Sequence, residues 1–190
     1  MKQPYKPLIL GICGSTSKNS SSWKLLEFIL AEYQDWFDLR LYEGLSSLPH
    51  FNPEFTTDNV PAEVVKLREQ IGQADGILFC TPEYVFSLPG SLKNLIEWNV
   101  STTLFSAKPV AMIVAAASGA KAFESLDLIL TTIESTLPDS SKLLIQGAKG
   151  KIRDKAVSDL IATDIMKTLQ SLMDTISVRK KTPTKYLNLN

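Results

Sequence analysis

Three short runs of almost continuously apolar residues, separated by longer segments with helical spacing, constrain the fold of this chain most. The runs are Leu8–Cys13, Gly76–Thr81 and Pro109–Ala117. Runs of this length and composition are typical of strands buried on both faces of a sheet. Because parallel strands need crossover helices, the chain is expected to form a parallel sheet with helices on both faces.

Two further strands and five helices complete this pattern. Residues 37–41 alternate apolar and polar side chains, which indicates an exposed edge strand, and residues 142–146 form a short fifth strand. Apolar residues at helical spacing predict helices near residues 20–33, 61–74, 91–100, 120–133 and 157–176. The pattern predicts a doubly wound α/β fold and leaves two strand orders open. Residues 1–178 are expected to form one domain, and the tail, residues 179–190, to be mobile or to reach a neighbouring subunit.

The charge balance and the scarcity of metal-ligating residues exclude several classes of function. Twenty basic and twenty acidic side chains give a formal net charge of +0, so neither nucleic acid nor an anionic membrane is an expected partner. One histidine and two cysteines are too few for the usual metal sites, and no metal is expected.

Cys13 and Cys80 lie inside apolar runs, as buried thiols do in a reducing compartment. With no apolar run near the N-terminus long enough for a signal or a membrane span, a cytoplasmic location is expected.

A loop rich in hydroxyl side chains follows the first predicted strand. It reads Gly14-Ser15-Thr16-Ser17-Lys18-Asn19-Ser20-Ser21-Ser22. Hydroxyl groups, the free amides of a helix N-terminus and the charge of Lys18 together suit a phosphate group. Alternatively, these serines only cap the helix and fill a polar turn. Cys13 and Thr16 stand where the dinucleotide fingerprint needs glycine, and Asn19 where the P-loop does, so neither nucleotide motif is present.

In open parallel sheets, ligands lie beyond the carboxyl ends of the strands, which directs attention to two further loops. The third strand leads into Pro82-Glu83-Tyr84-Val85-Phe86-Ser87-Leu88-Pro89-Gly90-Ser91-Leu92-Lys93-Asn94, and the fourth strand leads into Ser118-Gly119. Together with Gly14-Ser15 and residues 48–52, these segments resemble the NADPH-dependent FMN reductase family, flavodoxin-like proteins that include azo-dye, quinone and chromate reductases. The resemblance covers most of the chain. It implies a flavodoxin-like, doubly wound five-stranded parallel sheet of order 2-1-3-4-5 in three layers.

The resemblance also implies where FMN would bind. Serines of the first loop would surround its phosphate, with Lys18 supplying charge: Ser15, Ser17, Ser20, Ser21 and Ser22. Around the isoalloxazine ring, the second loop would contribute Pro82, Glu83, Tyr84 and Val85, and the far side would be formed by Ser118 and Gly119. Glu83 is expected to organise the backbone or to remain solvated rather than to act as an acid, and no catalytic side chain is expected.

Two departures from the family pattern stand inside this site. The family usually has arginine where this chain has Ser17, so charge neutralisation of the phosphate is expected to fall on Lys18 and the helix terminus. The family also usually reads Tyr-Asn-Gly where this chain reads Tyr84-Val85-Phe86. Phe86 places a large side chain where the family has its most flexible residue, which affects access of the substrate and of the nicotinamide.

These features predict an FMN-dependent oxidoreductase that takes electrons from NAD(P)H and passes them to a small-molecule acceptor such as a quinone, an azo compound, free flavin or a metal oxyanion. The alternatives are a flavodoxin-type electron carrier and a divergent flavin-binding sensor or interaction protein without efficient turnover. A homodimer or homotetramer is expected by the same resemblance. Trp98 lies off the apolar stripe of its predicted helix, so it is expected to face a subunit partner together with residues 49–53.

Overall fold

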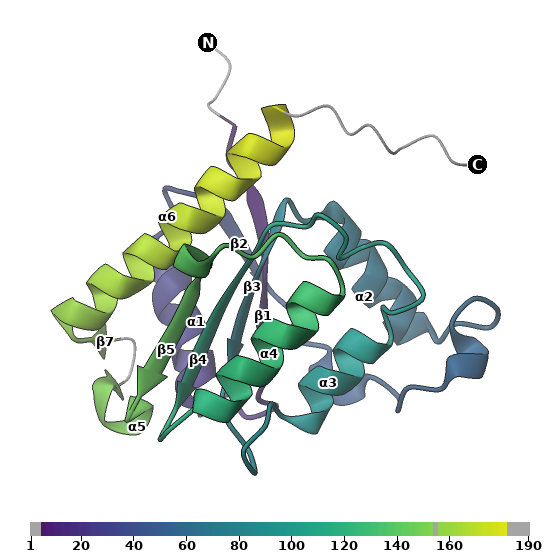
Figure 1. Ribbon diagram of the computed structural model, residues 1–190, viewed down its shortest axis with the longest axis horizontal. Coiled ribbons are helices and arrows are strands. Elements are labelled where there is room, and N and C mark those ends of the chain that lie inside the picture. Colours follow the sequence, from purple (N-terminus) through teal and green to yellow (C-terminus); the bar gives the residue numbers. More distant parts are fainter. Residues whose placement is uncertain (1–4, 154–155, 182–190) are drawn as a thin grey trace.

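The computed structural model describes residues 5–153 and 156–181, and its centre is a sheet of five parallel strands in the order β2-β1-β3-β4-β5 (Figure 1). The strands are β1 (Leu8–Cys13), β2 (Asp38–Leu41), β3 (Gly76–Thr81), β4 (Val110–Ala116) and β5 (Lys142–Gln146). All five were predicted from the sequence, and the order implied by the resemblance is confirmed. Every residue of β3 is buried, which fits its place at the centre of the sheet.

Helices cover both faces of the sheet, as the continuous apolar strands require (Figure 1). The helices are α1 (Ser21–Glu32), α2 (Ala62–Gln73), α3 (Gly90–Glu97), α4 (Ala120–Thr132), α5 (Ala148–Lys151) and α6 (Asp159–Lys181). On β1, Leu10 and Ile12 join a core with α2, α3 and α4, whereas Ile9 and Cys13 join a second core with α1 and α6. Alternate residues of one strand thus supply two cores, and the three-layer architecture is confirmed. Within the described residues, none of the helices is long and apolar enough to cross a membrane.

The segment between β5 and α6 was not predicted. It contains the single turn α5 and a two-stranded ribbon, β6 (Ile152–Arg153) paired antiparallel with β7 (Ala156–Val157). Ala148 and Ile152 are its buried anchors, and neither the helical nor the strand period can be read from so few residues. At the other end of α6, the helix runs to Lys181, so the expected boundary at residue 178 falls inside it, and residues 182–190 lie outside the described chain.

Trp98 does not face a subunit partner, so the expectation from the sequence was wrong on this point. Its side chain is 1% exposed, and its ring packs edge-on against Phe51 with ring centroids 5.4 Å apart. The indole Nε1 donates a hydrogen bond to the Pro49 carbonyl at 2.8 Å. The long loop before α2 therefore folds back onto the end of α3 and covers the tryptophan from within the same chain. Short 3-10 turns at Leu45–Ser47 and Pro53–Phe55 shape this loop, and a third lies at Asp139–Ser141 before β5.

A buried lysine fixes the end of α2 to the start of β4. Lys108 is 4% exposed, and its Nζ donates to the carbonyl oxygens of Ile71 at 2.9 Å and Ala74 at 2.7 Å. These carbonyls belong to the last turn of α2 and its cap, where helical geometry provides no amide partner. Burial lowers the pKa of Lys108 from 10.5 to about 8. The carbonyl groups at the end of α2 are thus hydrogen-bonded by an ammonium group whose charged form is destabilised by burial.

We expect the stability of the protein to rise with pH through this titration. Between about pH 8 and 10.5 the unfolded chain binds a proton at Lys108 that the folded chain has lost, so the free energy of unfolding increases across this window. The shift corresponds to an increase on the order of 3 kcal/mol. Denaturant unfolding of wild type and Lys108→Met at several pH values measures it, and the rise should be absent from the variant. Parallel pH profiles for the two proteins would contradict this assignment.

Candidate functional site

The three loops expected to carry chemistry meet at the carboxyl edge of the sheet, where β1 and β3 lie side by side. The amide of Gly14 donates to the Cys80 carbonyl at 2.8 Å, and Ser91 Oγ lies 3.4 Å from the Gly14 carbonyl. A Cβ atom at Gly14 would stand 2.1 Å from Thr81 Oγ1, which leaves no room for any larger residue. Glycine at this position therefore lets the first loop leave the sheet directly against β3.

Hydroxyl groups of the first loop hold its own backbone in shape. Ser15 Oγ accepts a hydrogen bond from the amide of Ser17 at 3.2 Å, and Ser17 Oγ accepts from the amide of Asn19 at 3.3 Å. Ser20 is the N-cap of α1, and its Oγ accepts from the amide of Trp23 at 3.2 Å. The prediction that a serine caps this helix is confirmed for Ser20. The backbone amides of Ser21 and Ser22 lie in the first turn of α1, where the helix provides no hydrogen-bond acceptor for them.

The predicted phosphate ligands differ in how they face solvent. Ser17 and Lys18 are exposed and Ser20 and Ser21 are half-buried, whereas Ser22 is fully buried on the inner side of α1. Ser15 is 5% exposed. The sequence spacing could not separate Ser22 from its neighbours, because the helix turns one serine in three or four toward the core.

Lys18 already has partners in the protein. Its Nζ lies 3.4 Å from Glu43 Oε1 and 5.1 Å from the centre of the Trp23 ring. Glu43 follows β2, and sequence analysis did not include it in the site, since nothing in its local sequence indicates a contact with the first loop. An exposed pair of this kind stabilises the fold by little, so a competing anion can draw the ammonium away.

Glu83 joins the second loop to the third. Its carboxylate accepts hydrogen bonds from the amides of Gly119 at 3.1 Å, Lys121 at 3.0 Å and Ala122 at 3.1 Å, which are the free donors at the start of α4. The hydrogen bond from the Ala122 amide lowers the pKa of Glu83 most, and the hydrogen bonds from Gly119 and Lys121 lower it further. The prediction that Glu83 organises the backbone is confirmed.

The second loop forms a tight turn at its tip. The amide and carbonyl of Tyr84 pair with the carbonyl and amide of Ser87 at 2.9 and 3.0 Å. Between them Val85 and Phe86 have φ angles of 50° and 54°, the geometry of a type I′ turn, which favours Asn-Gly. Tyr84 is 52% exposed, and its hydroxyl lies 3.5 Å from Ser15 Oγ, which connects the first and second loops.

The third loop begins α4 with a glycine in a left-handed conformation. Gly119 has φ 85°, and a Cβ there would stand 2.7 Å from Leu144 Cδ1. Ser118 beside it is exposed. The structure therefore brings the predicted residues of all three loops to one edge, linked by Ser15 with Tyr84 and by Glu83 with Gly119.

The two cysteines lie beneath this edge, and Cys13 lines a small pocket of about 90 Å³ there together with Ser15 and Lys18. Cys13 and Cys80 are paired across β1 and β3, and both are free and buried. Burial raises the pKa of both thiols, Cys80 most strongly. Both side chains are therefore neutral thiols at neutral pH, which suits a structural role in the core.

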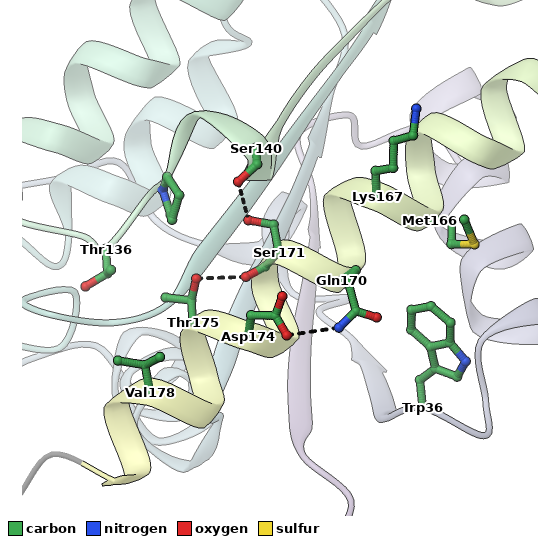
Figure 2. Close-up of a pocket in the computed structure, with 11 residues that line it drawn as sticks. Trp36, Thr136, Ser140, Met166, Lys167, Gln170, Ser171, Asp174, Thr175 and Val178 are labelled. Carbon is green, nitrogen blue, oxygen red and sulfur yellow. Dashed lines mark hydrogen bonds between the residues drawn. The ribbon is translucent and has the colours of Figure 1, made fainter.

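A larger groove lies at the opposite edge of the sheet. It measures about 690 Å³ and is lined mainly by α6, Trp36 and residues that precede β5 (Figure 2). Figure 2 shows Ser140 and Ser171 joined by a hydrogen bond, and Gln170 joined to Asp174. Trp36 and Ser140 precede β2 and β5, so this groove lies at the amino ends of the strands. The residues of the three loops take no part in it.

Comparison with known proteins places the chain among flavin reductases. The family described as NADPH-dependent FMN reductase matches residues 7–150. The NADH:(hydroxy)cinnamate reductase subunit CrdA of Vibrio ruber is 40% identical over 112 residues, which are 58% of this chain and 54% of that protein. An NAD(P)H-dependent FMN reductase of Pseudomonas aeruginosa is 35% identical over 111 residues, 57% of this chain and 60% of the relative. The matched segment thus spans little more than half of either relative.

A solved structure agrees with the fold over nearly the whole chain. FerB, a flavoenzyme NAD(P)H:acceptor oxidoreductase from Paracoccus denitrificans, superimposes with a TM-score of 0.77 and covers 90% of this chain and 98% of its own. The two sequences are 24% identical. This similarity supports the shared architecture.

We expect Glu83→Ala to destabilise the protein by about 1 kcal/mol, the usual cost of losing a helix N-cap. Because the pKa of Glu83 is lowered in the folded state, this contribution is fully present above the unfolded value near 4.5 and is lost as the pH falls through the folded pKa. Denaturant unfolding of both proteins between about pH 3 and 7, a range that includes the unfolded pKa of the carboxyl group, measures the difference.

Glu124→Ala is the matched control, since Glu124 lies on the same helix and its carboxylate forms an exposed ion pair with Lys121 at 2.7 Å. Its removal should change stability much less. Equal effects of the two substitutions would count against a capping role for Glu83.

Proposed function

The chain belongs to the NADPH-dependent FMN reductase family, and from this premise we propose that it is an FMN-dependent oxidoreductase that takes electrons from NAD(P)H and passes them to a small-molecule acceptor. One observation carries the proposal: the loops after β1, β3 and β4 are joined at one sheet edge by Glu83 and by the contact of Ser15 with Tyr84. Ligands of open parallel sheets lie at this edge.

The chemistry of the first loop fits a phosphate monoester. The amides at the start of α1 provide partial positive charge. The side chain of Ser17, which is exposed, and those of Ser20 and Ser21, which are half-buried, supply hydroxyl groups in the same loop. Lys18 would add a full charge on release from Glu43. Ser15 would act through the loop backbone, and the buried Ser22 is left out of the proposed set.

The second and third loops fit the flat ring of a flavin. Pro82, Tyr84 and Val85 would border one side, and Ser118 and Gly119 the other, with Glu83 holding the two sides at a fixed separation. When bound, FMN supplies the redox chemistry by accepting hydride from a nicotinamide and passing electrons onward. The protein would contribute phosphate binding, orientation of the ring and a limited space for each substrate in turn.

The acceptor, the assembly and the location are further parts of this proposal. The relative from Vibrio ruber is named as a (hydroxy)cinnamate reductase, which supports a small organic acceptor. A homodimer or homotetramer rests on the family resemblance, because the buried Trp98 provides no contact for it. The free, buried Cys13 and Cys80 support a reducing compartment such as the cytoplasm. Sedimentation at micromolar concentration tests the assembly, and a monomer would contradict it.

The central experiment is reconstitution with FMN. Purified protein is incubated with excess FMN, desalted and examined for flavin absorbance, and NADH or NADPH is then added with and without an acceptor. Retained flavin that is bleached by the nicotinamide and recovers with the acceptor would support the enzyme. Protein that keeps no flavin would overturn the proposal, and flavin bound without nicotinamide oxidation would favour the carrier or the sensor.

We expect Ser17→Arg to strengthen FMN binding about three- to tenfold, because a guanidinium on the exposed surface of the loop can pair with the phosphate. Fluorescence titration with FMN and with riboflavin, which lacks the phosphate, measures the effect. Riboflavin affinity should not change. Ser17→Ala is the control, since it removes the bond to Asn19 without adding charge. An equal gain for FMN and riboflavin would contradict phosphate binding at this loop.

A further inference from the structure

The tip of the second loop combines exposure with backbone strain. Val85 is 95% exposed and Phe86 is 77% exposed, and both have positive φ angles. A residue with a β-branched or bulky side chain rarely adopts this backbone conformation. The conformation carries a free-energy cost, and residues strained in this way are found mostly at functional sites. Figure 1 shows the turn between β3 and α3 projecting beyond the carboxyl edge of the sheet. Two apolar side chains are thus held in solvent by a backbone that glycine would adopt more easily.

Contacts on both sides impose this conformation. Before the tip, Glu83 is fixed by three amides at the start of α4, and Tyr84 lies beside Ser15. Across the tip, Tyr84 and Ser87 are joined by two backbone hydrogen bonds. After the tip, Leu88 is 6% exposed and packs into the core of α2, α3 and α4. The turn therefore has little freedom to withdraw its side chains, and it presents Phe86 in a defined place.

The loops around this tip have few charges to offer an ionic substrate. Residues 14–22, 82–91 and 117–121 contain three charged side chains, Lys18, Glu83 and Lys121. Lys18 pairs with Glu43 at 3.4 Å and Lys121 with Glu124 at 2.7 Å, while Glu83 is held by backbone amides. The large hydrophobic side chains that these segments expose are Tyr84, Val85 and Phe86, and they lie together at the tip of the second loop.

We propose that Phe86, supported by Val85, is a specificity-determining residue that stacks against the electron acceptor and selects flat, uncharged aromatic molecules over inorganic anions. The proposal rests on the proposed function and adds the substrate class. A flat aromatic molecule that stacks on the exposed ring is stabilised by burial of apolar surface and by the attraction between the two rings. A hydrated inorganic anion gains neither contribution. This gain offsets the cost of holding the turn in its strained form.

The test compares wild type with Phe86→Gly and Phe86→Leu, using 1,4-naphthoquinone as the aromatic probe and ferricyanide as the inorganic anion. Binding of the quinone to the oxidised, FMN-loaded protein is measured by calorimetry, and KM is measured for both acceptors with NAD(P)H. Phe86→Gly should raise the dissociation constant and KM of the quinone about tenfold, and Phe86→Leu should raise them less. The KM of ferricyanide and the affinity for FMN should stay within twofold.

Stability is a second readout that does not depend on turnover. Phe86→Gly relieves the positive φ and should raise Tm by about 2–4 °C, whereas Phe86→Leu should not. Leu128→Ala is the matched control, because Leu128 is 69% exposed on α4 and lies outside the three loops. It should leave the affinity for the quinone unchanged.

The outcomes separate the two proposals. Wild-type protein that holds no FMN or does not oxidise NAD(P)H would overturn the proposed function and this inference with it. An enzyme that holds FMN and turns over, but whose quinone affinity is the same in Phe86→Gly as in wild type, would overturn the role of Phe86 alone. Equal losses for quinone and ferricyanide would also overturn it, because selectivity is the property assigned to Phe86.

Discussion

The burial of β3 on both faces is the constraint from which the rest of the structure follows. Its six residues carry no exposed side chain, so helices must cover each face of the sheet. Parallel neighbours on both sides, β1 and β4, then require crossovers that return every strand in the same direction. All the loops that leave the carboxyl ends consequently gather at one edge, and the strand order reverses beside β1, which is where open parallel sheets generally bind their ligands.

At that edge, a small number of polar groups join loops that are distant in sequence. Glu83 uses the free amides of α4, which would otherwise be satisfied by water, to fix the second loop against the third. Gly14 lets the first loop pass directly over Thr81, where any side chain would collide. The hydroxyls that cap α1 also shape the loop to which the phosphate would bind. The same contacts thus give the fold its local stability and give the site its shape.

The turn at Val85 and Phe86 differs from the rest of the edge. In the first and third loops of this edge, side-chain type and backbone conformation agree, as at Gly119, where the left-handed residue is glycine. In the turn, two residues that disfavour positive φ adopt it, and the strain is sustained by the fixed segments on either side. Lys108 is a comparable case in the interior, because its buried charge is retained for the carbonyls at the end of α2. Both features persist because the surrounding structure stabilises them.

The sequence by itself determined the five strands, the principal helices, the three loops at the carboxyl edge and the cap at Ser20, because each is a local pattern of apolar spacing or of capping chemistry. Tertiary structure decided what depends on contacts between distant segments. It buried Trp98 under the loop at Pro49, turned Ser22 into the core, and gave Lys18 a partner in Glu43. It also ordered the ribbon of β6 and β7, whose few residues show no period. Hydrophobic spacing reports how a segment is buried, but a side chain's partner is set by where the other elements pack against it, and that information is spread over the whole chain.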